Sequence, residues 1–251
     1  MKETHTIPDI YTRSFMVDWD QTSPSGTLSI TGLLNFIQRI AGEHANLCHF
    51  GFYDMSRSGQ AWVLTRLKLC FTSMPKWNEK ISISTWIENM GGSISVRNLS
   101  FEHNGNTFAQ ISTVWVCLSI DKRIPEAIKA PCPEYLIHPE KKLDITTAGR
   151  VKIPTETKLL REHKVSFSDI DAMGHVNNIK YTQWILDSIP YKDALSITSG
   201  EIEVNFLSEL HIDDVVEIRC GNVETDGEAT FIIQKKGSEK PAFLSHYTPI
   251  K

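Results

Sequence analysis

Residues 174–185 read GHVNNIKYTQWI, and residues 26–37, at an offset of 148 (174 − 26), read GTLSITGLLNFI. Each stretch begins at a glycine, passes a polar turn and continues with apolar residues at helical spacing. A pattern that recurs over such a distance predicts two copies of one structural unit. The expected apolar stripes are Leu33, Phe36, Ile37, Ile40 and Ala41 in the first helix, and Tyr181, Trp184, Ile185 and Ile189 in the second.

A second match follows each helix. Residues 66–74 align with residues 201–209 at an offset of 135, which predicts an insertion between helix and strand in the first copy, around residues 43–61. Each unit is expected to begin with its helix and to continue into antiparallel strands. Alternating apolar and polar residues predict these strands at 80–87, 93–101 and 108–120 in the first copy, and at 215–219, 230–235 and 243–247 in the second.

This order of elements predicts an α+β protein with a tandem, or double, hotdog fold. In that fold each half is a curved antiparallel sheet wrapped around a long helix, and side-by-side pairing of the two sheets buries edges that would otherwise be open. We expect an N-terminal hotdog over residues 1–123 and a C-terminal hotdog over residues 158–251. The Pro-, Lys- and Thr-containing segment 124–157 is expected to connect them across the back of the joined sheet.

The composition indicates a globular protein. Of 251 residues, 41% are hydrophobic, and no apolar run approaches the roughly 18 residues that a membrane span requires. The first residues lead into no apolar segment, so we expect no secretory signal. Five cysteines without a CxxC pair predict free thiols in the cytoplasm, with neither metal nor cofactor. A net charge of −4 gives no general attraction to nucleic acid.

The two copies differ in their ionisable residues at matched positions. The second copy has Asp171 and His175 before its helix and Glu209 at the end of its first strand. The first copy has Thr27 where the second has His175, and Met74 where the second has Glu209. Loss of chemistry from one half explains this asymmetry, so we expect the C-terminal half to be catalytic and the N-terminal half to be non-catalytic.

A carboxylate, an imidazole and a helix N-terminus suit the hydrolysis of a thioester. The thioester carbonyl is electrophilic enough for attack by a water that a general base activates. Amides at a helix start can hold the oxyanion. We expect Gly174 to allow close approach of the backbone to the substrate, and Asn177 or Asn178 to cap the helix or to orient water.

The string DIDAMGHVNNIKY at residues 169–181 resembles the signature of the acyl-ACP thioesterases. The first half resembles the plant members of this family in the order and spacing of WVLTR (62–66), PKW (75–77), TWI (85–87) and STVWV (112–116). The resemblance covers most of residues 8–250. It implies catalytic roles for Asp171, His175 and Glu209.

Two positions depart from the family pattern. The catalytic asparagine of the family falls on Met173, and the cysteine that follows the acid falls on Leu210. Leu210 argues against a cysteine nucleophile and favours attack by water. Because Met173 has no side-chain amide, we expect Asn177, Asn178 or the backbone to take the role of the family's asparagine. Whether Asp171 or Glu209 is the general base stays open.

The resemblance implies hydrolysis of long-chain fatty acyl groups from the phosphopantetheine arm of acyl carrier protein (ACP), a terminating step of fatty acid biosynthesis. Alternatives are an acyl-CoA thioesterase of the same fold and a non-catalytic acyl-binding hotdog protein. Association into a homodimer is left open. The acyl chain is expected to lie in an apolar tunnel of the first hotdog, lined by Leu33, Phe36, Ile37, Ile40 and Trp62.

The ACP that carries the substrate of this family presents an acidic helix, so we expect a cationic docking surface on the thioesterase. Residues 122–164 hold ten Lys and Arg against six Asp and Glu, a net charge of +4 within an acidic chain. This segment is the candidate docking surface, and a solvated linker is the alternative.

Overall fold

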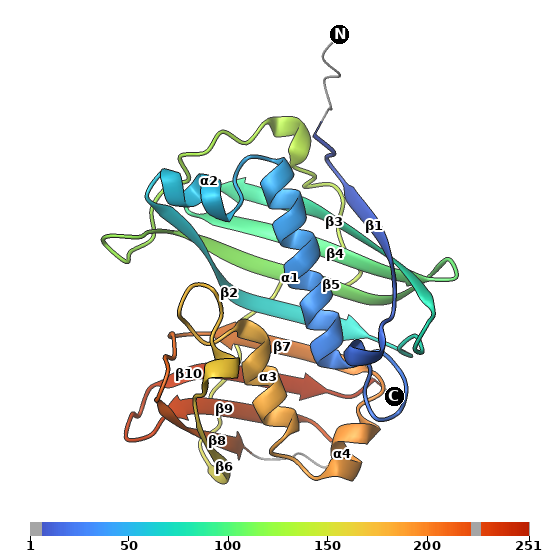
Figure 1. Cartoon of the computed structure of the whole chain (residues 1–251), viewed down its shortest axis with the longest axis vertical. Coiled ribbons are helices and arrows are strands. Elements are labelled where there is room, and N and C mark those ends of the chain that lie inside the picture. The colour runs from blue at the N-terminus through green and yellow to red at the C-terminus, as the bar shows by residue number, and fades with distance from the viewer. Residues whose placement is uncertain (1–6, 222–226, 251) are drawn as a thin grey trace.

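The computed structural model describes residues 7–221 and 227–250, and Figure 1 shows its ten strands forming one antiparallel sheet with the helices packed on one face. The strand order is β1-β3-β4-β5-β2-β7-β10-β9-β8-β6. The first five strands are β1 (Tyr11–Met16), β2 (Gln60–Phe71), β3 (Lys80–Gly91), β4 (Ile94–His103) and β5 (Asn106–Ser119). The other five are β6 (Thr157–Lys164), β7 (Gly200–Phe206), β8 (Val215–Gly221), β9 (Ala229–Lys235) and β10 (Pro241–Thr248).

The α-helices are α1 (Ile30–Leu47), α2 (Phe52–Arg57), α3 (Asn178–Leu186) and α4 (Tyr191–Ser196). Short 3-10 turns occur at η1 (Trp19–Gln21), η2 (Glu134–Leu136) and η3 (Phe167–Asp169). Helix α1 crosses the face of the first half of the sheet and α3 that of the second half. The predicted α+β double hotdog fold is confirmed.

The strand order is symmetric about the β2–β7 pair, where the two halves join. Adding 135 to Lys68 gives Glu203, and these two residues are direct partners in the antiparallel β2–β7 register. The pair therefore lies at the centre of an approximate two-fold relation between the halves. Hydrogen bonding between β2 and β7 closes one edge of each half-sheet, as expected.

The turn that precedes each helix has the same construction in both halves. Gly26 and Gly174, 148 residues apart, have φ angles of 76° and 80°, in the left-handed region that favours glycine. Ser29 and Asn177, also 148 apart, are the N-caps of α1 and α3, and each side chain accepts a hydrogen bond from a backbone N–H of the first turn. The predicted repeat is thus confirmed at the level of individual caps.

The expectation that each unit begins with its helix is wrong. Strands β1 and β6 precede α1 and α3, and they form the two outer edges of the sheet. Most of their side chains are partly or fully exposed. An edge strand that is open to solvent lacks the regular alternation that reveals a half-buried strand, so the sequence pattern did not predict them.

The insertion in the first copy is present where it was predicted. Helix α1 has 18 residues and α3 has 9, and α2 follows α1 before β2 begins. A short helix follows the long one in both halves, α2 before β2 and α4 before β7, so the greater length of α1 is the main difference between them (Figure 1).

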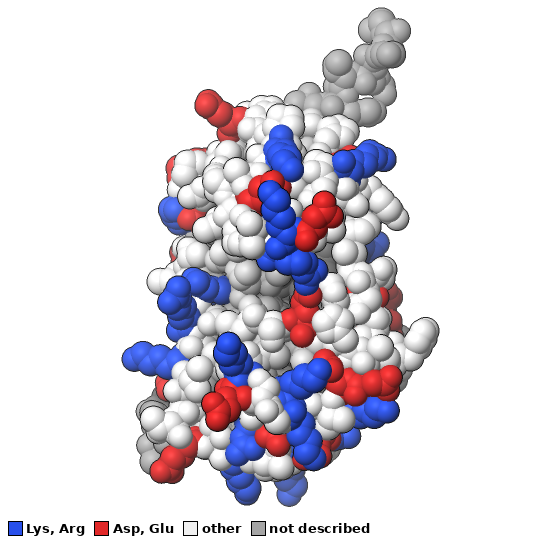
Figure 2. Space-filling model, turned by 90° about the vertical axis from the view of Figure 1, so that its left-hand side faces the viewer, with Lys and Arg blue, Asp and Glu red and all other residues white. Residues whose placement is uncertain are grey.

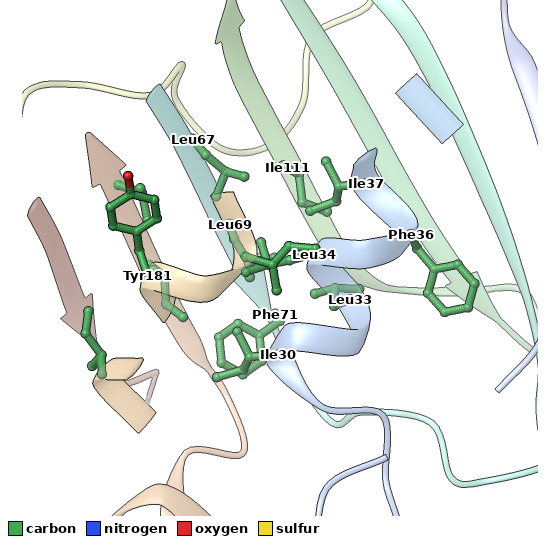
Figure 3. Close-up of a cluster of buried hydrophobic side chains, with 14 of the residues drawn as sticks. Ile30, Leu33, Leu34, Phe36, Ile37, Leu67, Leu69, Phe71, Ile111 and Tyr181 are labelled. Atoms are coloured by element: carbon green, nitrogen blue, oxygen red, sulfur yellow. The ribbon is translucent and has the colours of Figure 1, made fainter. Parts of the chain in front are cut away.

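The main hydrophobic core lies between the helices and the sheet and is continuous across both halves. Figure 3 shows Leu33, Leu34 and Ile37 of α1 above Leu67, Leu69 and Ile111 of the sheet, with Tyr181 of α3 on the far side of β2. Leu67, Leu69 and Phe71 alternate along β2 and face the helices, so Lys68 and Cys70 face the opposite side.

The segment between β5 and β6 runs over this opposite side. The Lys68 ammonium donates to Thr146 Oγ1 at 3.2 Å, and Val151 N–H donates to Asn205 Oδ1 at 2.9 Å. Trp86 Nε1 donates to the Lys141 carbonyl at 2.9 Å. The greater part of the segment therefore covers the face of the sheet that the helices leave free.

Candidate functional site

The turn at residues 170–176 holds the expected catalytic residues in a fixed arrangement. Ile170 and Val176 form an antiparallel bridge, Asp171 N–H donates to the His175 carbonyl at 2.9 Å, and Gly174 N–H donates to the Asp171 carbonyl at 3.0 Å. The Asp171 side chain accepts a hydrogen bond from Met173 N–H at 2.8 Å through Oδ1. Asp171 and His175 thus lie at opposite ends of one tight turn.

The neighbouring acid, Asp169, holds this turn in place. It is 5% exposed, and its carboxylate accepts hydrogen bonds from Ser166 N–H, His163 Nε2 and Trp184 Nε1. Burial alone would raise the pKa of Asp169, but these donors hold it below its ordinary value. The Asp169 carbonyl also accepts Asn177 N–H. These contacts make Asp169 a structural residue.

The expected acid, Glu209, lies beside His175. Their Oε2 and Nε2 atoms are 3.5 Å apart. Arg123, which follows β5 in the first half, forms an ion pair with the same carboxylate. Burial raises the pKa of the Tyr181 phenol, and the negative charges of Glu209 and Asp171 raise it further. The contact between Arg123 and Glu209 was not predictable from spacing, because it joins segments 86 residues apart.

Most backbone amides of the turn already have acceptors. The N–H groups of Met173, Gly174, Val176 and Asn177 donate within the turn, to Leu210 or to Asp169. Gly174 therefore shapes the turn with its positive φ. The Asn177 side chain accepts Ile179 N–H at 3.0 Å and Gln38 Nε2 at 3.4 Å through Oδ1, which leaves its Nδ2 group as the donor of this side chain. Asn178 begins α3, where the first amides have no acceptor within the helix.

A pocket of about 400 Å³ joins the two halves at this turn. From the second half it is lined by Asp171, Met173 and Asn177. The first half supplies mostly apolar walls, from α1, α2 and the sheet; they include Ala41, Ala45, Phe50, Met55, Trp62 and Trp115. A carboxylate thus lies in the wall of a mainly apolar pocket, as an acyl-chain site requires.

Of the five residues expected to line an acyl tunnel, only Trp62 belongs to this pocket. Leu33, Phe36, Ile37 and Ile40 are at most 2% exposed and lie in the core between α1 and the sheet. Figure 3 shows Leu33 and Ile37 beside other buried side chains, and Phe36 packs against Phe15 of β1. Large side chains fill their own face of α1, whereas the small residues Ala41, Gly42 and Ala45 leave space.

The two departures from the family pattern have different surroundings. Met173 is half exposed and lines the pocket. Leu210 is 2% exposed, and its carbonyl accepts Val176 N–H at 2.9 Å. Leu210 is therefore part of the core beneath the turn, and its apolar side chain offers no nucleophile there.

Within the described residues, His175, Glu209 and His211 are the group that could hold a metal ion, with one ligand atom each and all three within 4.8 Å of one another. Two imidazoles and a carboxylate match the ligands of several divalent transition metals. Arg123 competes for the same carboxylate. This ion pair weakens the case for a metal at these three side chains.

A second, larger opening of about 1090 Å³ lies at the matched position of the first half. Its walls include Thr27 and Met74, the counterparts of His175 and Glu209. Ser23 and Ser29, which also line it, are the counterparts of Asp171 and Asn177 at the offset of 148. Hydroxyl groups of Ser23 and Thr27 thus stand where the second half has Asp171 and His175, and the thioether of Met74 stands where it has Glu209.

Replacing Thr27 or Met74 with Ala is expected to leave thioester hydrolysis within a few-fold of the parent protein, because neither side chain is a base at neutral pH. Steady-state kcat with an acyl thioester is the measurement. A loss as deep as that caused by His175→Ala would move the active site into the first half.

A buried pair, His44 and Arg97, adjoins the pocket, which Arg97 helps to line. The His44 ring is fully buried; its Nε2 donates to the Pro8 carbonyl at 2.8 Å, and its Nδ1 accepts Arg97 Nη1 at 2.7 Å. Burial, together with the charge of Arg97, lowers the pKa of His44 from 6.5 to about 4. His44 is therefore neutral at pH 7.

Acidification below pH 6.5 is expected to destabilise the protein through His44. The unfolded chain takes up a proton near pH 6.5 and the folded chain only near pH 4. The unfolding free energy therefore falls by about 3 kcal/mol over that window. Urea titrations of the parent and of His44→Gln at several pH values measure this. The variant should show a flatter pH dependence between 6.5 and 4; equal slopes would contradict a neutral His44.

Charges on the molecular surface show no single docking face in the view of Figure 2, where cations and anions are interspersed. Several cations of the segment 122–164 have partners: Lys142 pairs with Glu88, and Lys141 lies over the Trp86 ring. Because much of the segment covers the sheet face opposite the helices, those of its cations that lie there are remote from the pocket. Within the described residues, no helix combines the length and the apolarity needed to cross a bilayer.

Comparison with protein families gives two matches. Residues 8–135 match the family model described as the acyl-ACP thioesterase N-terminal domain, and residues 153–248 match the acyl-ACP thioesterase C-terminal domain. A palmitoyl-acyl carrier protein thioesterase of Gossypium hirsutum is 26% identical over 219 residues, covering 82% of this chain and 52% of the relative. An oleoyl-acyl carrier protein thioesterase of Coriandrum sativum is 24% identical, covering 90% and 67%. The chain thus spans about half the length of the first of these relatives.

Comparison with solved structures also gives acyl-ACP thioesterases, and these matches cover nearly the whole chain. A crystal structure of an acyl-ACP thioesterase from Bacteroides thetaiotaomicron has a TM-score of 0.87 at 26% identity, covering 96% of this chain and 97% of the other. The 12:0-ACP thioesterase of Umbellularia californica has a TM-score of 0.77 at 18% identity, covering 97% and 98%, and so supports the fold alone.

Proposed function

Because the chain belongs to the acyl-ACP thioesterase family, we propose that it hydrolyses the thioester of long-chain fatty acyl-ACP to a free fatty acid and ACP. The observation that carries this proposal is the position of Asp171, a carboxylate of the second half in the wall of an apolar pocket of the first half. Both halves would then contribute to one active site, the first by holding the acyl chain and the second by cleaving it.

Asp171 is the group best suited to activate water. Its Oδ1 accepts one hydrogen bond from Met173 N–H, which leaves the second carboxylate oxygen to take a proton. The water oxygen then bonds to the thioester carbon, the tetrahedral intermediate collapses, and the carbon–sulfur bond breaks. The proton held by Asp171 passes to the departing sulfur of the phosphopantetheine arm, so the carboxylate is restored.

Glu209 and His175 are better suited to positioning and polarisation. The Glu209 carboxylate already has Arg123 and His175 as partners, so it can fix the orientation of the imidazole. The imidazole can then donate a proton or a hydrogen bond to the reacting groups. The oxyanion would be held by Asn177 Nδ2 and by the N–H of Asn178 at the start of α3, where the helix dipole favours negative charge.

The preferred carrier, ACP or CoA, distinguishes an acyl-ACP thioesterase from an acyl-CoA thioesterase. Hydrolysis rates with ACP and CoA thioesters of the same acyl groups, over several chain lengths, provide the test. We expect a higher kcat/KM with acyl-ACP. A clear preference for acyl-CoA would favour the general thioesterase alternative, and absence of hydrolysis of either would favour an acyl-binding protein.

The pocket lining leads to a prediction about chain length. Replacing Ala45 with Leu would add bulk to the α1 wall, and overpacking of this kind costs enough to lower kcat/KM for long acyl chains by roughly tenfold or more. Short chains should be hydrolysed almost as before, since they do not extend past the added side chain. Equal effects on all chain lengths would place the acyl group outside this pocket.

The same proposal implies that ACP is the partner, that the protein is cytoplasmic and that it takes part in fatty acid biosynthesis. The ACP surface would approach the side of the pocket where Asp171 lies, near Arg123 and the turn of the second half. The five cysteines are free thiols, as a reducing compartment favours.

A further inference from the structure

The larger opening of about 1090 Å³ is the two-fold counterpart of the acyl pocket, the pocket of about 400 Å³ that contains Asp171. The residues that the second half gives to the acyl pocket are Asp171, Met173 and Asn177. The residues 148 positions earlier all line the larger opening, and they are Ser23, Ser25 and Ser29. The turn of each half therefore forms part of the wall of one opening.

The helices follow the same relation. Gln38 and Ala41 of α1 line the acyl pocket. The residues 148 positions later, Leu186 and Ile189, line the larger opening. In both openings, the turn of one half thus faces the helix of the other half. The fold has kept two openings of the same construction, although only one of them holds the ionisable groups.

The lining of the larger opening suits an acyl group. The hydroxyl groups of Ser23 and Ser25 are 2.6 Å apart, and those of Ser25 and Thr27 are 2.8 Å apart. Hydroxyls can donate to a carbonyl oxygen, but they are not bases at neutral pH. The second half adds apolar side chains that are only partly buried, namely Leu186, Ile189, Leu195 and Ile197. Covering these side chains with a hydrocarbon chain would be favourable.

The charges of this lining give no preference for the head of the acyl group. Lys76 and Lys180 line the larger opening together with Asp20 and Asp187, so the two signs balance. A free carboxylate and a neutral thioester therefore both remain compatible with these walls, and an experiment has to distinguish them.

Asn177 belongs to the linings of both openings. Its Oδ1 accepts hydrogen bonds from Ile179 N–H and Gln38 Nε2, so Nδ2 is the donor of this side chain. The mechanism proposed above uses the same Nδ2 group to hold the oxyanion. A carbonyl in the larger opening that accepts from Nδ2 would draw this donor away from the catalytic side. Binding in one opening would then slow hydrolysis in the other.

We propose that the larger opening is a second, non-catalytic site for a long-chain acyl group, and that its occupancy inhibits hydrolysis through Asn177. The ligand is a free fatty acid or an acyl thioester, which share the chain and the carbonyl oxygen. The regulatory part of this proposal rests on the thioesterase function proposed above, whereas the binding part does not.

Isothermal titration calorimetry of the full chain counts the bound molecules. One probe is dodecanoate below its micelle concentration. The other is an analogue of dodecanoyl-pantetheine in which a methylene group replaces the sulfur, so the carbonyl remains and hydrolysis is blocked. We expect two molecules per chain with at least one probe, and the probe that gives two identifies the head group. At most one molecule per chain with both probes would overturn the proposal.

Two variants block the larger opening from different halves. Ala194→Trp adds bulk on α4, Ser25→Trp adds bulk on the turn, and both residues line the opening. Each should reduce the number of bound molecules from two to one. The matched control is Lys192→Trp, which places the same side chain at an exposed position of α4 outside this lining and should still bind two. A blocking variant that unfolds like the parent and still binds two molecules would place the second molecule elsewhere.

Kinetics with butanoyl-pantetheine as a short substrate test the inhibition. A probe molecule in the acyl pocket raises only the apparent KM, whereas one in the larger opening lowers kcat at saturating substrate. Coupling of the usual size predicts a kcat lowered by roughly fivefold or more. The ratio of kcat with and without the probe, measured within each variant, should approach unity in Ala194→Trp and Ser25→Trp and stay low in Lys192→Trp. Purely competitive inhibition of the parent would overturn the coupling.

The variant Asn177→Asp tests the route of this coupling. An aspartate keeps an oxygen that can accept Ile179 N–H but has no Nδ2 donor. Its kcat without the probe should be low, the probe should lower it no further, and two molecules should still bind. Continued inhibition of this variant would exclude Asn177 as the link. If the protein cleaves neither acyl-ACP nor acyl-CoA, the proposed thioesterase function fails, and the number of bound molecules still decides whether the second site exists.

Discussion

Replacing Asp171 with Asn, or His175 with Ala, is expected to lower kcat by roughly 10²-fold or more, the usual contribution of a positioned acid–base group. Asp171→Asn removes the base but keeps an oxygen that can accept Met173 N–H, so the turn should persist. His175→Ala removes the imidazole that lies 3.5 Å from Glu209. Steady-state kinetics of the purified variants with an acyl thioester give the measurement.

The control for this prediction is the kcat of the Glu209→Gln variant. If Asp171 is the base and Glu209 orients His175, Glu209→Gln should retain more activity than Asp171→Asn, because a glutamine can still accept a hydrogen bond from the imidazole. The reverse order would make Glu209 the base. Near-normal turnover of Asp171→Asn or His175→Ala, with unfolding curves like that of the parent, would remove the proposed site altogether.

The repeat was predictable because its turn chemistry survives in both halves. Gly26 and Gly174 need a left-handed φ, and Ser29 and Asn177 need a side-chain oxygen for the cap. These local requirements restrict the residue type at fixed spacing, and the spacing is readable without a structure. The same holds for the inner strands, in which one buried face imposes alternation.

The edge strands and the pocket were less accessible to sequence reasoning. Strands β1 and β6 bury little and so have no strong pattern. For the pocket, apolar spacing identifies the buried face of α1 but does not separate a filled face from a hollow one. The space lies beside small residues such as Ala41 and Ala45, which carry a weaker signal than Leu33 or Phe36.

Contacts between the halves were the part least open to prediction. Arg123 meets Glu209, and Gln38 meets Asn177, across the junction of the two hotdogs. Neither pair is recognisable from spacing, because each depends on how β2 and β7 join. The asymmetry of Thr27 and Met74 against His175 and Glu209 did identify the half with ionisable groups, yet the pocket itself belongs mainly to the other half.

The assignment of Phe36 to the core, as opposed to the pocket, leads to a large expected effect on stability. Phe36 is 2% exposed, and its ring lies 5.1 Å from that of Phe15 on β1. Phe36→Ala removes a buried aromatic side chain and leaves a cavity, which typically costs about 3–5 kcal/mol. A shift of the urea midpoint with an unchanged slope would measure this loss.

The same variant should keep the acyl-chain preference of the parent, because Phe36 packs between α1 and β1 and the pocket wall is formed by other residues of α1. Ala45→Leu is the matched opposite: it should change chain preference while costing less stability than Phe36→Ala, since it adds bulk to a hollow face. Kinetics with several chain lengths and urea unfolding of both variants give the comparison. If Phe36→Ala extends the accepted chain length and leaves the unfolding free energy unchanged, Phe36 faces the acyl chain and the tunnel expected from the sequence is restored. If each variant changes only its own property, one helix serves two purposes, with large side chains holding the fold and small ones making room for the substrate.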